Sequence, residues 1–272
     1  MLLRLARSGT LRLALLAGAL LVLAVLTRET MLPFALSAAL WAGWRVASLA
    51  GTARGVLTGA SVLAVLAAGL APWLMHNHRV YGEYALGGEF GAALYAGSDP
   101  LLFSSFPDGS VDISRDRIFA ALPARPALAG AEPLAVDHWL RERAVARISA
   151  DPVSFAGRFA RKVWIAFRPL PSPLHGMLAN LTYAFVWVPL LLLGLAGLWH
   201  SRSEWRHDTL FYAQFAAFAG ITGMIWAQTA HRVFLDPYLM VFAAGLVSSW
   251  LGIRPLQPQG DLCQGSGGRQ CS

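Results

Sequence analysis

The chain has 272 residues, of which 56% are hydrophobic and only 14% are charged, and its formal net charge is +7. Several apolar runs reach the roughly 17 to 25 residues that cross a bilayer as a helix, which excludes an ordinary water-soluble domain. The cations are nearly all arginines spread along the chain without a patch of interleaved aromatic residues, so nucleic acid is excluded as a partner and membrane lipids or phosphate-bearing substrates are favoured.

Six apolar segments predict an all-α polytopic membrane protein with about six transmembrane helices. The expected spans are residues 11–27, 32–50, 56–75, 180–199, 209–229 and 233–252. They divide the chain into three spans in 1–75, an outer-face, partly helical polar segment in 76–179, three spans in 180–253, and a disordered tail in 254–272. Arg4, Arg7 and Arg12 before the first span also resemble the start of a signal peptide, but no small-residue cleavage site follows them.

Arginines in the short loops predict the orientation, because such loops stay on the cytoplasmic side. All of these arginines fall on one side of the predicted spans: Arg4, Arg7, Arg12, Arg45, Arg54, Arg202, Arg206 and Arg254. Both termini are therefore expected in the cytoplasm. The periplasmic or extracellular face of the cytoplasmic membrane then holds Arg28, the 76–179 segment, and the turn at His231 and Arg232.

The sequence "TRET" places Arg28 and Glu29 between two apolar spans. An arginine at the bilayer centre costs roughly 2.5 to 3.5 kcal/mol on insertion scales, so both charges are expected at the outer end of a tight helical hairpin. Pro33 fits the start of the second helix, after Thr30 as its cap. Two interpretations stay open for Arg28, an anchor at the interface or a binding site for an anionic group.

The polar segment is expected to be irregular at first, because it is rich in glycine and turn dipeptides. A helix follows, with Leu134, Trp139, Leu140, Ala144 and Ile148 on one face. Asp151 and Pro152 predict the start of a second helix, residues 152–167, which is amphipathic and aromatic. Phe155, Phe159 and Trp164 are expected to face the membrane, and a solvated helix packed on its own domain is the alternative.

The sequence contains no nucleotide-binding loop and no recognisable catalytic triad. His76 and His78 lack a third ligand nearby, so no metal site and no cofactor are predicted. Cys263 and Cys271 lie in the tail and predict neither a disulfide framework nor a metal site.

Four stretches resemble elements of the GT-C superfamily, membrane glycosyltransferases of the protein O-mannosyltransferase and lipid A aminoarabinose transferase type. In chain order they are "GALLVLAVLTRETMLPFALSAALWAGW", "APWLMHNHRVYGEYALGGEFGAALYAGSDP", "LRERAVARISADPVSFAGRFARKVWIAFRP" and "HRVFLDPYLMVFAA". The resemblance covers about residues 13 to 253. It implies transfer of a sugar from a polyprenyl-phosphate carrier to a lipid, glycan or protein acceptor on the outer face.

Such an enzyme needs cations for the carrier phosphate and a carboxylate base for the acceptor hydroxyl. The phosphate-binding candidates are Arg28, Arg79, His231 and Arg232. The other outer-face candidates are Glu29, His76, Asn77, Tyr81 and Asp236.

The catalytic carboxylate of the family precedes the "LTR" hairpin, and no residue here matches it, so the catalytic residue is unknown. The chain resembles the C-terminal, carrier-binding half of such an enzyme, for which a separate N-terminal half would be a partner. The alternative is a non-catalytic membrane interaction protein that retains the fold. A transporter is disfavoured because the sequence shows no internal repeat.

Overall fold

The computed structural model describes residues 1–122, 133–171, 173–225, 232–233 and 235–253, and every regular element in these ranges is helical. The α-helices are α1 (Leu2–Ser8), α2 (Leu11–Thr27), α3 (Leu32–Ala50), α4 (Thr52–Tyr81), α5 (Phe90–Ser98), α6 (Val111–Ala120), α7 (Pro133–Ala150), α8 (Pro152–Phe167), α9 (Met177–His200), α10 (Trp205–Met224) and α11 (Asp236–Trp250). Short 3-10 helices cover Glu29–Met31, Pro100–Phe103 and Ser201–Glu204. The expected all-α class is confirmed.

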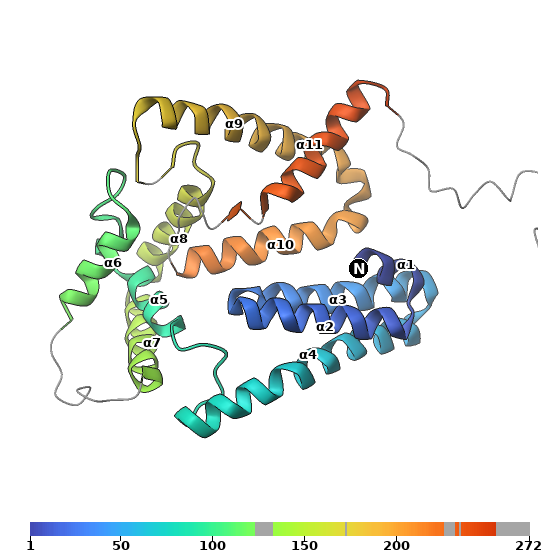
Figure 1. Ribbon diagram of the computed structural model, residues 1–272, viewed down its shortest axis with the longest axis horizontal. Coiled ribbons are helices and arrows are strands. Elements are labelled where there is room, and N and C mark those ends of the chain that lie inside the picture. Colours follow the sequence, from blue (N-terminus) through green and yellow to red (C-terminus); the bar gives the residue numbers. More distant parts are fainter. Residues whose placement is uncertain (123–132, 172, 226–231, 234, 254–272) are drawn as a thin grey trace, which may run out of the picture.

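The long helices form a bundle, and the helices of the polar segment gather at one of its ends (Figure 1). Helices α2 and α3 pack on α4, α1 packs on α3, and α9 packs on α11. Helix α10 is central, since it contacts α3 on one side and α8 on another. Helices α5 to α8 lie at the end where α4 and α10 finish (Figure 1). The polar segment therefore covers one end of the bundle.

Each of the six predicted spans corresponds to a helix, although the boundaries differ. Two stretches, Thr52–Tyr81 and Met177–Ser203, are long and apolar enough to cross a membrane by length and composition. Helix α4 continues through the predicted end of its span, so residues 76–81 form its last turns instead of opening the polar segment. Helix α11 starts at Asp236, and part of the predicted 209–229 span lies outside the described residues.

The turn at "TRET" joins α2 to α3 as expected, but the cap is different. Pro33 occupies the first turn of α3, where its missing N–H has no intrahelical partner to lose. Thr30 does not cap the helix, because Met31 stands at that position and makes no side-chain capping bond. The Thr30 hydroxyl instead accepts a hydrogen bond from Arg28 Nε over 3.1 Å.

The glycine-rich start of the polar segment is irregular over residues 82–89, as the sequence predicts, but the next glycines lie in a helix, α5, where irregular structure was also expected. Its glycines allow close approach of other elements to α5. A Cβ atom on Gly91 would collide with the backbone oxygen of Asp137 in α7, and one on Gly97 would collide with the carbonyl oxygens at the end of α10. Glycine density here marks tight packing and not a loop.

Helix α7 buries the face that its sequence predicts. Leu134, Leu140 and Ala144 are buried, and Trp139 and Ile148 pack against the same cluster.

Two side chains of α7 also fasten it to α5. Asp137 accepts hydrogen bonds from the backbone N–H groups of Gly91 (2.9 Å) and Ala92 (2.8 Å) at the start of α5. At the other end of α5, Arg147 forms an ion pair of 2.9 Å with Asp99 and donates to the Tyr95 carbonyl.

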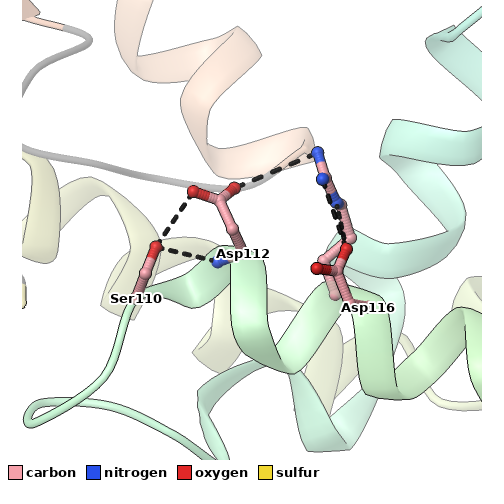
Figure 2. A network of polar contacts seen from close by, with 4 residues as sticks. Ser110, Asp112 and Asp116 are labelled. Atoms are coloured by element: carbon pink, nitrogen blue, oxygen red, sulfur yellow. Dashed lines mark hydrogen bonds and ion pairs between the residues drawn. The ribbon is translucent and has the colours of Figure 1, made fainter.

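Helix α6 begins with a capped, charged turn on the surface (Figure 2). The Ser110 hydroxyl accepts from the backbone N–H of Asp112 over 3.1 Å and donates to its carboxylate over 2.9 Å. Arg115 pairs with Asp116 over 3.3 Å at a partly exposed position. Such exposed pairs contribute little to stability, so the N-cap is what fixes the start of α6.

Helix α8 starts as predicted but faces its neighbours differently. The Asp151 carboxylate accepts from the Ser154 N–H over 3.0 Å, and Pro152 follows in the first turn. The buried residues are Phe155, Lys162, Ile165 and Ala166, whereas Trp164 is 67% exposed. Phe155 and Trp164 are nine positions apart, about half a turn out of phase, so the prediction that they share a face is wrong.

We expect Gly97→Ala to destabilise the protein by about 1 to 3 kcal/mol, because the added methyl group has no space beside α10. Gly157→Ala in α8 is the matched control: its Cβ meets nothing within 4 Å, so it should gain about 0.5 to 1 kcal/mol of helix propensity. Thermal unfolding followed by far-UV circular dichroism measures both. A Gly97→Ala midpoint as high as that of the control would contradict the close approach of α5 to α10.

Candidate ligand site between α3 and α10

The turn after α2 borders a pocket of about 160 Å³. One wall comes from the turn and the start of α3, and the other from the second half of α10. The lining residues are Arg28, Thr30, Met31, Phe34, Gln214, Ala217, Phe218, Ile221, Thr222 and Ile225. The space is enough for a small polar group.

Arg28 is exposed, and among the described residues its side chain is the only charged one in this lining. Its Nε–H donates to Thr30, and this bond holds the guanidinium at the turn. The guanidinium has further N–H donors in a planar fork that suits a phosphate or carboxylate. The pocket therefore has a cationic group beside a largely apolar interior.

Two polar side chains of α10 lie deeper in the same pocket, and the sequence analysis did not single them out. Gln214 and Thr222 are each 3% exposed. The Oε1 atom of Gln214 is buried and has no hydrogen-bond partner among the described residues. An acceptor without a partner in such a place costs stability, and a ligand donor would relieve that cost. A glutamine inside an apolar segment was the available signal.

Lys162 is the most buried charged group of the described residues, and the sequence analysis did not single it out. Its side chain has no exposed surface, and Nζ donates to the carbonyl oxygens of Gly97 (2.8 Å), Met224 (3.2 Å) and Ile225 (2.8 Å). Burial, and to a lesser extent the charge of Arg158, lowers the pKa of Lys162 to about 7. Lys162 thus fixes Ile225, which lines the pocket, to α5 and α8.

Glu29 turns away from the pocket toward the polar segment. Its carboxylate lies against Gly87, where a Cβ atom would collide with it. Burial raises the pKa of Glu29, and the nearby charges of Asp137 and Glu89 raise it further. A raised pKa brings a carboxyl group closer to the range in which a general base works.

Arg232 lies apart from the pocket, in the packing between α8, α9 and α11. It is 2% exposed, its guanidinium carbon lies 3.4 Å from the Trp187 ring centre, and Nη1 donates to the Ala166 carbonyl over 2.6 Å. Nη2 donates to the Tyr183 hydroxyl. Asp236 faces it, with 3.9 Å between Nε and Oδ1. The structure therefore gives Arg232 and Asp236 a role in holding helices together.

Four of the remaining predicted candidates lie at the end of α4. Arg79, His76 and Tyr81 are exposed and do not line the pocket, and His76 stacks on Trp73 with 5.7 Å between ring centres. Asn77 is buried and donates to the Ala85 carbonyl over 2.7 Å, which folds the following loop back on α4.

His231 lies outside the described residues. Among the predicted site residues that the structure describes, Arg28 alone borders this pocket.

The part of the chain that the structure describes contains no cluster of three or more His, Cys, Asp or Glu side chains suited to a metal ion. Comparison with known proteins adds no information on the function of this site. No protein family, no curated protein and no solved structure matches the chain.

We expect Glu29→Gln to raise the unfolding midpoint at neutral pH. The pKa of Glu29 is raised above its ordinary value of 4.5, so protonated Glu29 favours the fold below that pH, and this contribution is lost as pH rises through the folded-state pKa. Glutamine mimics the protonated acid at every pH. The unfolding midpoints of the wild type and of Glu29→Gln should therefore converge at about pH 4.

Thermal unfolding across a pH series measures this difference, and Glu83→Gln makes the same chemical change elsewhere in the polar segment as a control. A constant difference between wild type and Glu29→Gln at all pH values would show that Glu29 is not held in a raised-pKa environment.

Proposed function

We propose that this protein is a multi-pass protein of the cytoplasmic membrane that binds a polyprenyl-phosphate-linked sugar and serves as a glycosyltransferase, or as its carrier-binding half. The acceptor would be a lipid, a glycan or a protein on the outer face. The observation that carries the proposal is the pocket between α3 and α10, with Arg28 beside an otherwise largely apolar lining. The resemblance of four sequence stretches to GT-C enzymes supports the same function.

The chemistry of the carrier fits this pocket. In glycosyl transfer the carrier phosphate is the leaving group and gathers negative charge in the transition state, so a fixed cation stabilises it. Arg28 supplies that cation. The unpartnered Oε1 of Gln214 is suited to accept a hydrogen bond from a hydroxyl group of the sugar.

An apolar groove supplies a surface for an isoprenoid chain. It has a volume of about 710 Å³ and lies between α8, α9 and α10. Its walls include Trp164 and Phe167 of α8, Leu192 and Leu195 of α9, and Phe215 of α10. Phe185 of α9 is 81% exposed, so the outer surface of that helix is also suited to lipid.

Glu29 is the carboxylate that we propose as the base. It follows Arg28 directly and is half-buried. Its raised pKa brings it closer to the working range of a general base near neutral pH. Because its carboxylate lies against Gly87 and outside the pocket lining, the acceptor hydroxyl would have to approach from the side of the polar segment for Glu29 to take its proton while Arg28 stabilises the departing phosphate.

The second candidate is a non-catalytic membrane interaction protein that keeps the fold. One observation favours it, namely that Arg232, another of the predicted phosphate ligands, is buried in helix packing. The two candidates differ in two measurable properties. The enzyme binds the carrier through Arg28 and transfers sugar only when Glu29 is present. The interaction protein neither binds the carrier through Arg28 nor transfers sugar.

We expect Arg28→Ala to weaken binding of a polyprenyl phosphate in nanodiscs by about tenfold to a hundredfold, since a charge-assisted hydrogen bond is lost. Arg28→Lys should rescue binding poorly, because an ammonium group lacks the planar fork. Arg12→Ala, at the other end of α2, is the matched control and should bind as the wild type does. Glu29→Gln should bind the carrier but not transfer the sugar. Wild-type affinity in folded Arg28→Ala would leave Arg28 as an interfacial anchor.

We expect a reporter fused at Gly109 to lie outside the cell membrane and one fused at Ser203 to lie in the cytoplasm. The reason is that the loops rich in arginine stay inside, whereas long polar segments translocate largely regardless of their charge. Alkaline phosphatase and fluorescent-protein fusions measure the two positions. The reverse result would place Arg28 on the cytoplasmic side and remove the proposed site.

A further inference from the structure

A second polar pocket lies at the opposite end of α3, where α1, α3 and α10 meet. It has a volume of about 270 Å³ and is lined by Leu3, Ala6, Arg7, Trp41, Arg45, Asp208 and Phe211. The stacked rings of Trp44 and Trp205, with centres 6.1 Å apart, join α3 to α10 at this end. The proposed function makes no use of this pocket.

Two buried polar atoms in this lining have no hydrogen-bond partner among the described residues. One is Nε1 of Trp41, a donor on a side chain that is 5% exposed. The other is Oδ2 of Asp208, an acceptor in the first turn of α10. A buried polar group without a partner costs stability, so both atoms point to a ligand that accepts from Trp41 Nε1 and donates to Asp208 Oδ2.

The charged side chains around these atoms indicate which chemical groups the ligand carries. Arg7 and the buried Arg45 add two cations to the Trp41 donor, and together they suit the oxygens of a phosphate. Asp208 adds one carboxylate, which suits an ammonium group with N–H donors. A phosphate ester that carries a primary amine satisfies both halves of the pocket.

An apolar chamber adjoins the polar pocket. It has a volume of about 300 Å³ and shares Leu3 and Phe211 with that pocket. Most of its other walls are apolar, among them Leu20, Leu21 and Phe34. A hydrocarbon chain attached to the phosphate would enter it directly, and burial of its CH₂ groups would favour binding.

We infer that the seam between α1, α3 and α10 binds a phospholipid with an ethanolamine headgroup. Arg7, Arg45 and Trp41 Nε1 hold the phosphate, Asp208 Oδ2 accepts from the ammonium group, and an acyl chain occupies the adjoining chamber. Choline is disfavoured because its quaternary nitrogen has no N–H for Asp208. A glycerol headgroup is disfavoured because it offers Asp208 only neutral hydroxyl donors, whereas ethanolamine offers a charged N–H donor. The inference rests on the proposed membrane setting and not on sugar transfer.

The test is lipid binding to the whole protein in mild detergent, measured by native mass spectrometry. Palmitoyl-oleoyl phosphatidylethanolamine, phosphatidylcholine and phosphatidylglycerol are titrated separately, with soluble O-phosphoethanolamine as a fourth probe. The wild type should bind the ethanolamine lipid about tenfold or more tightly than the other two lipids, and the soluble compound far more weakly.

Three variants assign the contacts. Asp208→Asn should abolish the preference for ethanolamine, and Trp41→Phe should weaken its binding about tenfold because the ring stays and the donor is lost. Trp44→Phe is the matched control on the same helix, outside the pocket lining, and should keep wild-type binding. Unfolding midpoints show that each variant is folded.

Equal affinity for the three lipids would overturn the inference, as would an unchanged preference in Asp208→Asn. Soluble O-phosphoethanolamine binding as tightly as the lipid would also overturn it, because the ligand would then be a soluble phosphoamine. Binding of polyprenyl phosphate by Asp208→Asn tests the proposed function separately, so that the failure of one does not imply the failure of the other.

Discussion

A single buried ammonium group joins the polar segment to the helical bundle. Lys162 of α8 donates to a carbonyl at the end of α5 and to two carbonyls at the end of α10, all within 3.2 Å. Three acceptors match the three protons of an ammonium group, which offsets part of the cost of burying it. Burial lowers the pKa of this group to about 7, so its charge depends on these carbonyls staying in place. This contact and the packing of α8 against α10 together hold α10 beside α5 and α8.

Helix α10 also decides where ligands can enter, because it meets α3 along a seam that contains cavities. Polar residues of α10 lie in this seam near both of its ends, Asp208 in the first turn and Gln214 and Thr222 further along. Each end also has arginine side chains from the first helices, Arg28 at one and Arg45 at the other. The physical arrangement is the same at both ends: cations beside buried polar atoms, with apolar walls between. Phosphate esters carrying hydrocarbon chains fit such surroundings.

The structure places the predicted site residues in two different surroundings, a pocket and the packing between helices. Arg28 borders a pocket, whereas Arg232 supports helix packing through Ala166, Tyr183 and Trp187. Both are arginines at the ends of apolar segments, and nothing in the local sequence distinguishes them. The difference arises because α8 and α9, distant in sequence from Arg232, surround its guanidinium. Gln214 and Lys162 were missed for the same reason, since the elements that bury them come from other parts of the chain.

The sequence by itself determined the helical class, the place of each long helix, the proline-started turns at Pro33 and Pro152, and the buried face of α7. These features depend on local hydrophobic periodicity and on backbone groups within a few residues. Only the tertiary structure decided that the glycines of α5 are sites of close helix contact, that Lys162 faces inward while Trp164 faces outward, and that Thr30 binds Arg28 instead of capping α3. Those outcomes depend on which helices become neighbours, and that is settled by packing of segments that are far apart in the chain.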